Sequence, residues 1–396
     1  MLRKTILSAA ILIPVMAHAA GLSVYEMGTS DLGYAGAGTA ARAEDASTVY
    51  ANPAGMTRLQ GNQLTVAGQA LYGKADYKLD GLGALGGGNP QNAVGWVPGG
   101  SAFYSHSLSD RLKLGVGVYN SFGAALDLGN SWAGRNIATY MELVAMTVQP
   151  TVAYRLNDNW SLGAGLTANY AVMKTERIAL TGGKLTQKDG DWEYSARLGV
   201  MYEPSKSTRI GLVWTDKVEY QFDFTPSITG FAGRTHTLPV DMWANSPQQV
   251  MASVFHRLND TWALTGNIGW QDWSQFSTIT VEVGAASSTL TLPLQDTWHA
   301  ALGAQYTYNA RTKVSAGVSY DTSFYKNQNQ TSFLLPSGAA WRFGTGVQYV
   351  LSPKSDLGLA FEYLRMDSSS DPSTLVSGKY NTPEMFFMAV NYMHRF

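Results

Sequence analysis

The sequence predicts an all-β protein: a transmembrane antiparallel β-barrel of about fourteen strands with an N-terminal segment folded inside it. Three observations support this. The chain of 396 residues begins with an export signal. Long stretches alternate between apolar and polar residues with a period of two, and no later apolar run is long enough for a membrane-spanning helix. Charged residues make up only 14% and aromatic residues 12%, which is typical of an outer-membrane barrel.

The first nineteen residues have the three parts of a signal peptide. Arg3 and Lys4 form a basic start, Thr5–Met16 is an apolar core too short to span a bilayer, and Ala17-His18-Ala19 is an A-x-A cleavage site. We predict a signal peptide over residues 1–19 with cleavage after Ala19. The alternative is a buried N-terminal helix.

Strands follow with a clear alternation. In Asn159–Val172, one face carries the large apolar side chains and the other is small and polar. The same pattern recurs at Trp298–Tyr306, Trp341–Tyr349 and Leu357–Tyr363. Aromatic residues often close these segments at both ends, as two interfacial girdles require. A soluble β-sandwich also alternates, but it does not require aromatic ends.

The connections between strands alternate in length, which predicts the strand number. Tight turns are marked by six dipeptides: Ser109-Asp110, Asn157-Asp158, Ser205-Lys206, Asn259-Asp260, Asn309-Ala310 and Ser352-Pro353. Seven long loops lie near 80–95, 124–140, 182–190, 225–243, 284–293, 325–339 and 368–382. Short periplasmic turns and long outer loops then connect fourteen strands over residues 62–396, with both chain ends on the periplasmic side.

Two further features bear on the wall of this barrel. Phe386–Phe396 alternates toward a terminal Phe396, which resembles the signal read by the machinery that inserts outer-membrane barrels. Pro98-Gly99-Gly100 and Pro150 fall in or beside strands and remove ladder donors, so each implies an edge, a bulge or a local opening. For Pro150 we expect a bulge without a role in transport.

Residues 20–61 precede the first strand and contain the sequence VYANPAGM (Val49–Met56). Asn-Pro interrupts both helices and ladders. A fourteen-stranded barrel is too wide for its own side chains to fill. We therefore expect this Gly- and Ala-rich segment to be a hatch that plugs the lumen, with Pro53 fixing a turn against the wall.

The chain resembles the long-chain fatty acid and aromatic hydrocarbon transporter family of outer membranes (the FadL/TodX type). The resemblance covers essentially the whole mature chain. It is carried by GYAGAGTAARAEDASTVYANPAGM (Gly33–Met56), WVP (Trp96–Pro98), VAYRLNDNWSLGAGL (Val152–Leu166), KTER (Lys174–Arg177) and DWSQF (Asp272–Phe276). It implies a monomeric barrel with a hatch, capture of hydrophobic substrate at the outer loops, and passive release past a kinked third strand, partly sideways into the membrane.

The resemblance also implies roles for individual residues. Asn52, Pro53 and Ala54, followed by Gly55, match the hatch motif, and Gly123 matches a glycine at the kink of the third strand. A glycine inside a strand independently suggests a bend. Arg177 matches an arginine that meets the polar head of a bound amphiphile, where a charge-assisted hydrogen bond would hold a carboxylate. Balance by a neighbouring acid is the alternative role for Arg177.

Some positions depart from the family pattern. Gln295 stands where the family can place a head-group lysine, Asn120 replaces a serine near the kink, and LPSGAAWRF (Leu335–Phe343) lacks the acidic residues of a late loop. Fewer cations weaken the case for a carboxylate substrate and keep neutral or aromatic compounds open.

An apolar outer loop is the other candidate for substrate contact. SWAGRNIATYMEL (Ser131–Leu143) contains Trp132, Ile137, Tyr140, Met141 and Leu143. Such a cluster is unusual in water unless it binds something or packs on the barrel rim. We assign Trp132, Tyr140 and Met141, together with Met173, Asn120 and Arg177, to substrate binding, with rim packing as the alternative.

Several function classes have little support. The net charge of −1 argues against a nucleic-acid partner, and the absence of cysteine removes thiolate metal sites and disulfides. The histidines show neither metal-ligand spacing nor a catalytic motif. We expect no metal and no cofactor.

The predicted function is passive transport of hydrophobic small molecules, long-chain fatty acids first, across the outer membrane of a Gram-negative bacterium. Expected partners are that ligand, outer-membrane lipid and lipopolysaccharide, and the assembly machinery. Three alternatives remain. One is a channel for aromatic or other neutral hydrophobic compounds, and another is a general porin. The third is a lipid-modifying barrel enzyme that depends on a histidine such as His106 or His299.

Overall fold

A computed structural model describes residues 29–81, 86–180, 182–229, 235–237, 239–276, 278–283, 286–291 and 293–396. The predicted signal peptide (1–19) and the first residues of the predicted hatch (20–28) lie outside the described residues.

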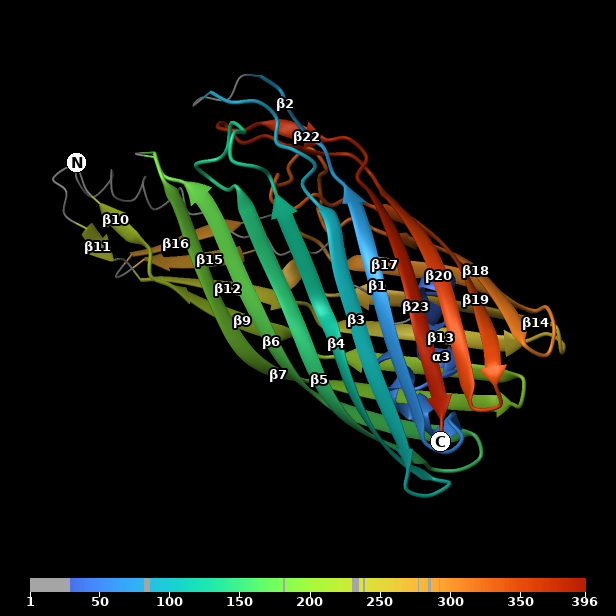
Figure 1. The fold of residues 1–396 in the computed structure, drawn as a ribbon. Coiled ribbons are helices and arrows are strands. Elements are labelled where there is room, and N and C mark those ends of the chain that lie inside the picture. Colours follow the sequence, from blue (N-terminus) through green and yellow to red (C-terminus); the bar gives the residue numbers. More distant parts are fainter. Residues whose placement is uncertain are drawn as a thin grey trace.

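Fourteen antiparallel strands close into one barrel, so the predicted fold class is confirmed. Figure 1 shows the strands strongly tilted around the barrel axis. In chain order, which is also their order around the barrel, the strands are β1 (Gln63–Lys74), β3 (Gly95–Ser107), β4 (Leu112–Asp127), β5 (Tyr140–Arg155), β6 (Trp160–Ile178), β7 (Lys184–Ser205), β8 (Thr208–Thr215), β13 (Gln249–Arg257), β14 (Trp262–Gln271), β17 (Thr297–Thr307), β18 (Thr312–Asp321), β19 (Ala340–Ser352), β20 (Ser355–Met366) and β23 (Glu384–Arg395).

The six tight turns lie where the sequence predicts them and mark one end of the barrel. Barrel closure pairs β1 with β23 in a continuous register from Gln63↔Arg395 to Lys74↔Glu384. Phe396 N donates to Asn62 O at 3.0 Å, so the last residue returns to the start of the first strand. The C-terminus and the short turns therefore share the end that we assign to the periplasm (Figure 1).

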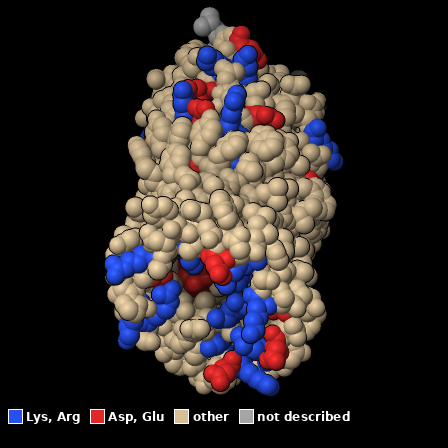
Figure 2. Space-filling model, turned by 90° about the vertical axis from the view of Figure 1, so that its right-hand side faces the viewer, with Lys and Arg blue, Asp and Glu red and all other residues tan. Residues whose placement is uncertain are grey.

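Two rings of aromatic residues bound an apolar outer band. The ring near the tight turns contains the pairs Trp160–Tyr202 (4.4 Å between centroids) and Trp262–Tyr306 (4.7 Å). The ring toward the other end contains the pairs Tyr170–Trp192 (5.0 Å) and Tyr320–Trp341 (4.9 Å). The ten residue-to-residue steps from Trp160 to Tyr170 along the tilted strand rise about 25 Å, the height of an outer-membrane apolar band. Figure 2 shows an uncharged middle between two charged ends.

The outer end is more regular than the sequence predicts. The prediction of a loop at 182–190 is wrong, because β7 begins at Lys184 and pairs with β6 up to Ile178↔Lys184. Most of the other outer connections also contain strands. These are β2 (Tyr77–Leu79), β9 (Val218–Phe224), β10 (Ser227–Thr229), β11 (Thr235–Thr237), β12 (Val240–Ser246), β15 (Thr278–Val283), β16 (Ala286–Thr291), β21 (Ser369–Asp371) and β22 (Gly378–Tyr380), with one 3₁₀ turn, η3 (Ser274–Phe276). Threonine and valine favour this extended backbone once neighbouring connections supply partners.

Four short helical segments occupy the lumen near the C-terminal end of the barrel, in blue in Figure 1. They are α2 (Thr29–Gly33), α3 (Thr39–Arg42), α4 (Thr48–Ala51) and the 3₁₀ segment η2 (Pro53–Arg58). In these segments and the turns that join them, alanines 35, 37, 40, 41, 46 and 54 are completely buried. Within the described part of the chain, no helix has the length and apolar character to cross a membrane. We call residues 29–61 the hatch.

We predict that Leu166→Arg destabilises the barrel by about 2–4 kcal/mol, because Leu166 is 69% exposed midway between the aromatic rings and would place a charge at the bilayer centre. Leu180→Arg is the matched control, since Leu180 is equally exposed beyond the outer ring and should cost at most about 1 kcal/mol. Denaturant unfolding in lipid vesicles measures both. Equal costs would contradict the placement of the membrane.

Candidate functional site

The hatch rests on glycines of the barrel wall. A β-carbon on Gly199 would overlap the Asn52 side chain, one on Gly163 would overlap the Pro53–Ala54 backbone, and one on Gly211 would overlap Ala40 O. A second group on β18 and β19, Gly317, Gly344 and Gly346, receives the backbone of residues 32–35 in the same way. Only glycine allows the two backbones to approach this closely.

Asn52 connects the hatch to the wall through its side chain. Its Nδ2 donates to Ala40 O at 2.7 Å and to Val200 O of β7 at 3.0 Å, and its Oδ1 accepts from Ala54 N at 3.0 Å. Pro53 follows as the first residue of η2, where a missing N–H costs nothing. Gly55 lies against Thr48 and Ala43, where a β-carbon would overlap. The four predicted hatch residues therefore act together as one turn.

Arginines of the wall complete the hatch helices. Arg209 of β8 donates to Ala41 O (2.8 Å) and Arg42 O (2.7 Å), and Arg197 of β7 donates to Tyr50 O (2.6 Å). Arg155 of β5 donates to Thr57 O. These carbonyls belong to the last turns of α3, α4 and η2, which have no partner within the helix. A cation there also complements the helix dipole.

The wall itself is interrupted between β3 and β4. The two strands pair only from Ser101↔Tyr119 to Ser107↔Lys113, whereas β3 still pairs with β1 up to Gly95. At the outer limit of the interruption, Asp127 N donates to Ala93 O at 2.7 Å. We call this bounded, unpaired part of the wall the window. Its inner edge is the Ser101–Tyr119 pair and its outer edge is the Ala93–Asp127 contact.

The residues that the sequence analysis placed at a kink lie at this window. The register of β4 against β5 shifts between Asn120 and Phe122, so Ser121 is the extra residue of a β-bulge. Asn120 Oδ1 accepts from Gly100 N at 3.4 Å across the gap. Gly123 pairs with Val144 on the lipid-facing side of the wall, and no atom lies within 4 Å of a β-carbon built there. A bulge and a run of Pro98-Gly99-Gly100 on the facing strand explain why pairing stops.

Pro150 does not behave as predicted. The pairing of β5 with β6 skips from Val148↔Ala168 to Thr151↔Gly165 and keeps the same register. The expected bulge is therefore wrong, because Pro150 removes a donor without inserting an extra residue.

A large apolar cluster fills the barrel mouth inside the window. Trp132, Met141 and Met173 are at most 6% exposed and belong to this cluster. The Trp132 ring lies 5.3 Å from that of Phe333, and its Nε1 donates to Ala138 O at 2.7 Å. We call these buried residues, with Leu126, Leu143, Ala145, Tyr220 and Tyr380, the mouth cluster. The loop therefore packs into the rim, as the alternative to substrate binding predicts, and Trp132 and Met141 are not exposed at the surface.

Arg177 and Tyr140 lie beyond the outer aromatic ring, but not together. Arg177 is half-buried on the inward face of β6, and burial lowers its pKa. Tyr140 lies on the other face of β5 from Met141, where its hydroxyl donates to Glu142 at 3.0 Å and its ring contacts Lys174. Burial and this bond to Glu142 raise the pKa of Tyr140 to about 12. The geometry separates Tyr140 from the mouth cluster.

A polar pocket that sequence reasoning missed lies between the hatch and the bulge. It has a volume of about 50 Å³, and its lining includes Tyr50 of the hatch, Tyr119 and Ser121 of β4, and Arg197. Tyr220 connects it to the mouth cluster. We call it the inner pocket. The sequence signal for this pocket was an arginine, Arg197, at an inward-facing position in the middle of a membrane-spanning strand.

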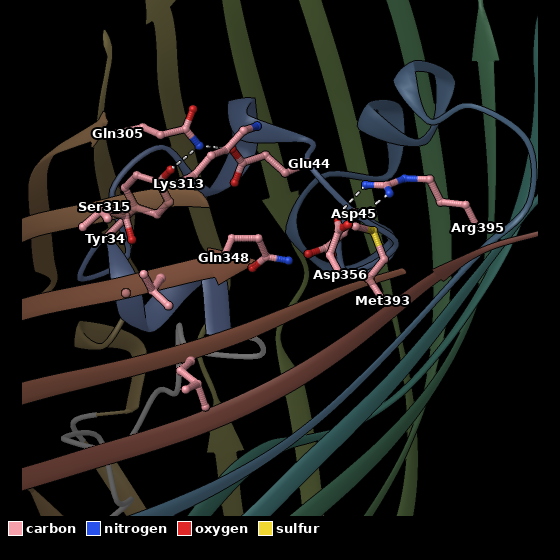
Figure 3. A pocket seen from close by; sticks show the side chains of 14 residues that line it. Tyr34, Glu44, Asp45, Gln305, Lys313, Ser315, Gln348, Asp356, Met393 and Arg395 are labelled. Carbon is pink, nitrogen blue, oxygen red and sulfur yellow. Dashed lines mark hydrogen bonds and ion pairs between the residues drawn. The ribbon is translucent and has the colours of Figure 1, made fainter. Parts of the chain in front are cut away.

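A second cavity, of about 90 Å³, lies between the hatch and β17–β20 and β23 near the periplasmic end, and Figure 3 shows that polar and charged side chains dominate it. Gln305 donates to the Tyr34 hydroxyl and to Glu44, both at 2.9 Å. Arg395 donates to Asp356 at 2.7 Å. This cavity suits water better than an apolar solute. Among the described residues, no group of histidines and carboxylates could hold a metal.

A family model described as "Outer membrane protein transport protein (OMPP1/FadL/TodX)" matches residues 10–379. The chain is 24% identical to the long-chain fatty acid transport protein of Escherichia coli K12 over 421 residues, covering 92% of each chain. Solved structures with the same fold include a Pseudomonas aeruginosa FadL homologue (TM-score 0.83, 16% identity, 95% and 100% of the two chains covered) and the Pseudomonas putida toluene transporter TodX (TM-score 0.71, 17% identity, 92% and 99% covered).

We predict that Gly199→Val unseats the hatch and opens an ion-conducting path, because the new side chain would occupy the space of Asn52 and Pro53. Single-channel conductance in planar bilayers should rise well above the wild-type level. Gly68→Val is the control, since Gly68 faces open space in the fully paired β1. Deletion of residues 20–61 gives the upper limit of conductance. If that deletion left conductance unchanged, the segment would not be a plug.

Proposed function

The chain belongs to the outer membrane protein transport protein family (OMPP1/FadL/TodX), and from this premise we propose that it carries hydrophobic small molecules inward across the outer membrane without an energy source. Long-chain fatty acids are the first candidate substrate, as named for the Escherichia coli relative. The ligand would pass without chemical change, with direction set by its consumption inside the cell.

The observation that carries this proposal is the position of the window. The hatch lies in the lumen, and the cavity between it and β17–β20 is lined mostly by polar and charged side chains. The window lies in the wall beside the mouth cluster, because Leu126, a member of the cluster, lies on the stretch of β4 that has no partner in β3. We propose that an apolar solute leaves the mouth cluster sideways through this gap into the membrane.

Affinity would come from apolar contact. We propose that the outer loops admit the ligand and that Trp132, Met141 and Met173 rearrange around it. Each Å² of apolar ligand surface removed from water contributes about 25 cal/mol. Methionine suits this task because its flexible side chain adapts to ligands of different shape. Arg177, at the outer end of the same inward face as Met173, would meet a polar head.

Neutral aromatic compounds are the second candidate, and one contact favours them. Gln295 stands where the family can place a head-group lysine, and its Nε2 donates to Ser323 O at 3.0 Å. Its amide is thus engaged with backbone and offers no positive charge to a carboxylate. The fold similarity to the toluene transporter is consistent with either substrate class.

We also propose the surroundings in which the chain works. It would act as a monomer, with its apolar band in lipid and its outer strands among lipopolysaccharide. Phe396 is 62% exposed at the end of β23, where the assembly machinery could read it.

Blocking the window should stop transport without unfolding the barrel. Gly123→Phe adds a bulky side chain on the lipid-facing side of the wall beside the window, where the lateral exit would lie, so uptake of labelled substrate should fall several-fold in cells that lack their own transporter. Gly68→Phe is the matched control, because Gly68 also faces free space but lies in a fully paired strand. Normal uptake through Gly123→Phe would reject the lateral route.

The substrate class can be assigned by comparing labelled oleate with labelled toluene in the same cells. We expect oleate uptake that falls when Arg177 is replaced by alanine, because the head group loses a charge-assisted bond. Toluene uptake that is indifferent to Arg177→Ala would identify a neutral substrate instead. Entry of neither compound would favour the porin or enzyme alternatives.

A further inference from the structure

The inner pocket contains a buried cation with no carboxylate partner. Arg197 is 6% exposed, and no described acidic side chain lies within ion-pair distance of it. Its partners are Tyr50 O at 2.6 Å and the Tyr50 ring, whose centroid is 4.0 Å from Cζ, and its Nε has no hydrogen-bond acceptor. A buried charge in this condition is costly and favours binding of an anion.

The pocket suits a carboxylate in size and in its other donors. A water molecule needs at least about 10–15 Å³ of such space, so 50 Å³ holds a carboxylate group but not an acyl chain. Ser195 and Thr167 hydroxyls, 3.0 Å apart, and the Ser121 hydroxyl of the bulge line it and can rotate to donate. Asp216 also lines the pocket, and its Oδ1 accepts from Lys217 N.

Resting on the proposed function, we propose that the inner pocket binds the carboxylate head of the transported amphiphile through Arg197, while the apolar tail lies in the mouth cluster beside the window. Tyr220 borders both spaces and Tyr119 is both a pocket residue and the inner edge of the window. The site is distinct from that of Arg177, which lies beyond the outer aromatic ring.

Binding there would also act on the hatch. Arg197 currently holds Tyr50 O, a neutral carbonyl, and a carboxylate is the stronger acceptor for a guanidinium. The ligand would take the unpartnered Nε–H and neutralise the charge that strengthens the bond to Tyr50 O, so its binding weakens the hold of Arg197 on α4. The Tyr50 ring lies 4.9 Å from Tyr119 in an edge-to-face contact, so a shift of Tyr50 reaches the window directly.

The test compares decanoate with decanol, which have the same chain length but differ in charge, as ligands of the purified full-length protein in detergent. Titration calorimetry should show that wild type binds decanoate about tenfold more tightly, as one charge-assisted bond implies. Arg197→Gln should remove that preference while decanol binding is unchanged, and Arg197→Lys should restore part of it. Because binding is measured without transport, a failure of uptake in cells leaves this result intact.

Arg209→Gln is the matched control, because Arg209 also holds hatch carbonyls but does not line the inner pocket. It should keep the preference for decanoate. The proposal is overturned if wild type shows no preference or if the preference survives Arg197→Gln. It is also overturned if Arg197→Gln and Arg209→Gln weaken both ligands equally, since that result describes a purely structural role in seating the hatch.

Discussion

A chain that crosses a membrane as strands must pair nearly all its backbone donors and acceptors, because lipid offers none. Closure of β1 on β23 meets this requirement. The interruption between β3 and β4 leaves part of the backbone without ladder partners. Two features reduce the number of unpaired groups: Pro98 has no N–H, and the N–H of Gly100 donates to Asn120 Oδ1. Unpaired backbone at this depth persists only where it faces protein or a cavity, and Leu126 on the unpaired stretch of β4 belongs to the mouth cluster.

The hatch depends on the wall in turn. Its helical segments have four to six residues, far below the roughly 12–15 needed for a helix to be stable alone in water. Ala35 and Ala43 also hold left-handed backbone (φ of 50° and 45°), which costs alanine energy. Arg209, Arg197 and the wall glycines compensate through bonds and close contact. Loss of a few such contacts would therefore release the whole segment, which suits a gate.

Patterns with a local cause could be predicted from the sequence. Lipid contact fixes the alternation around Leu166, and the turn dipeptides fix where strands reverse. The hatch motif was visible because Asn-Pro is incompatible with a strand. Contacts between distant residues left no such signal: Arg197 and Tyr50 are 147 positions apart, and the loop that holds Trp132 is covered by Phe333. Nor does the sequence of one outer loop reveal that another loop will pair with it, as β12 and β15 do.

The hatch and the window are joined by the aromatic contact between Tyr50 and Tyr119, and this contact determines which ligands can move the hatch. Tyr50 lies between Arg197 and Tyr119, and Tyr119 bonds through its hydroxyl to Gln149, which also holds Val49 O of the hatch. A ligand shifts such an arrangement only by its difference in affinity for the two states. An uncharged ligand gains the same apolar contacts whether or not Arg197 holds Tyr50. A carboxylate gains a charge-assisted bond to Arg197 and weakens the bond between Arg197 and Tyr50 O, so head-group charge is the property that can couple ligand binding to release of the hatch.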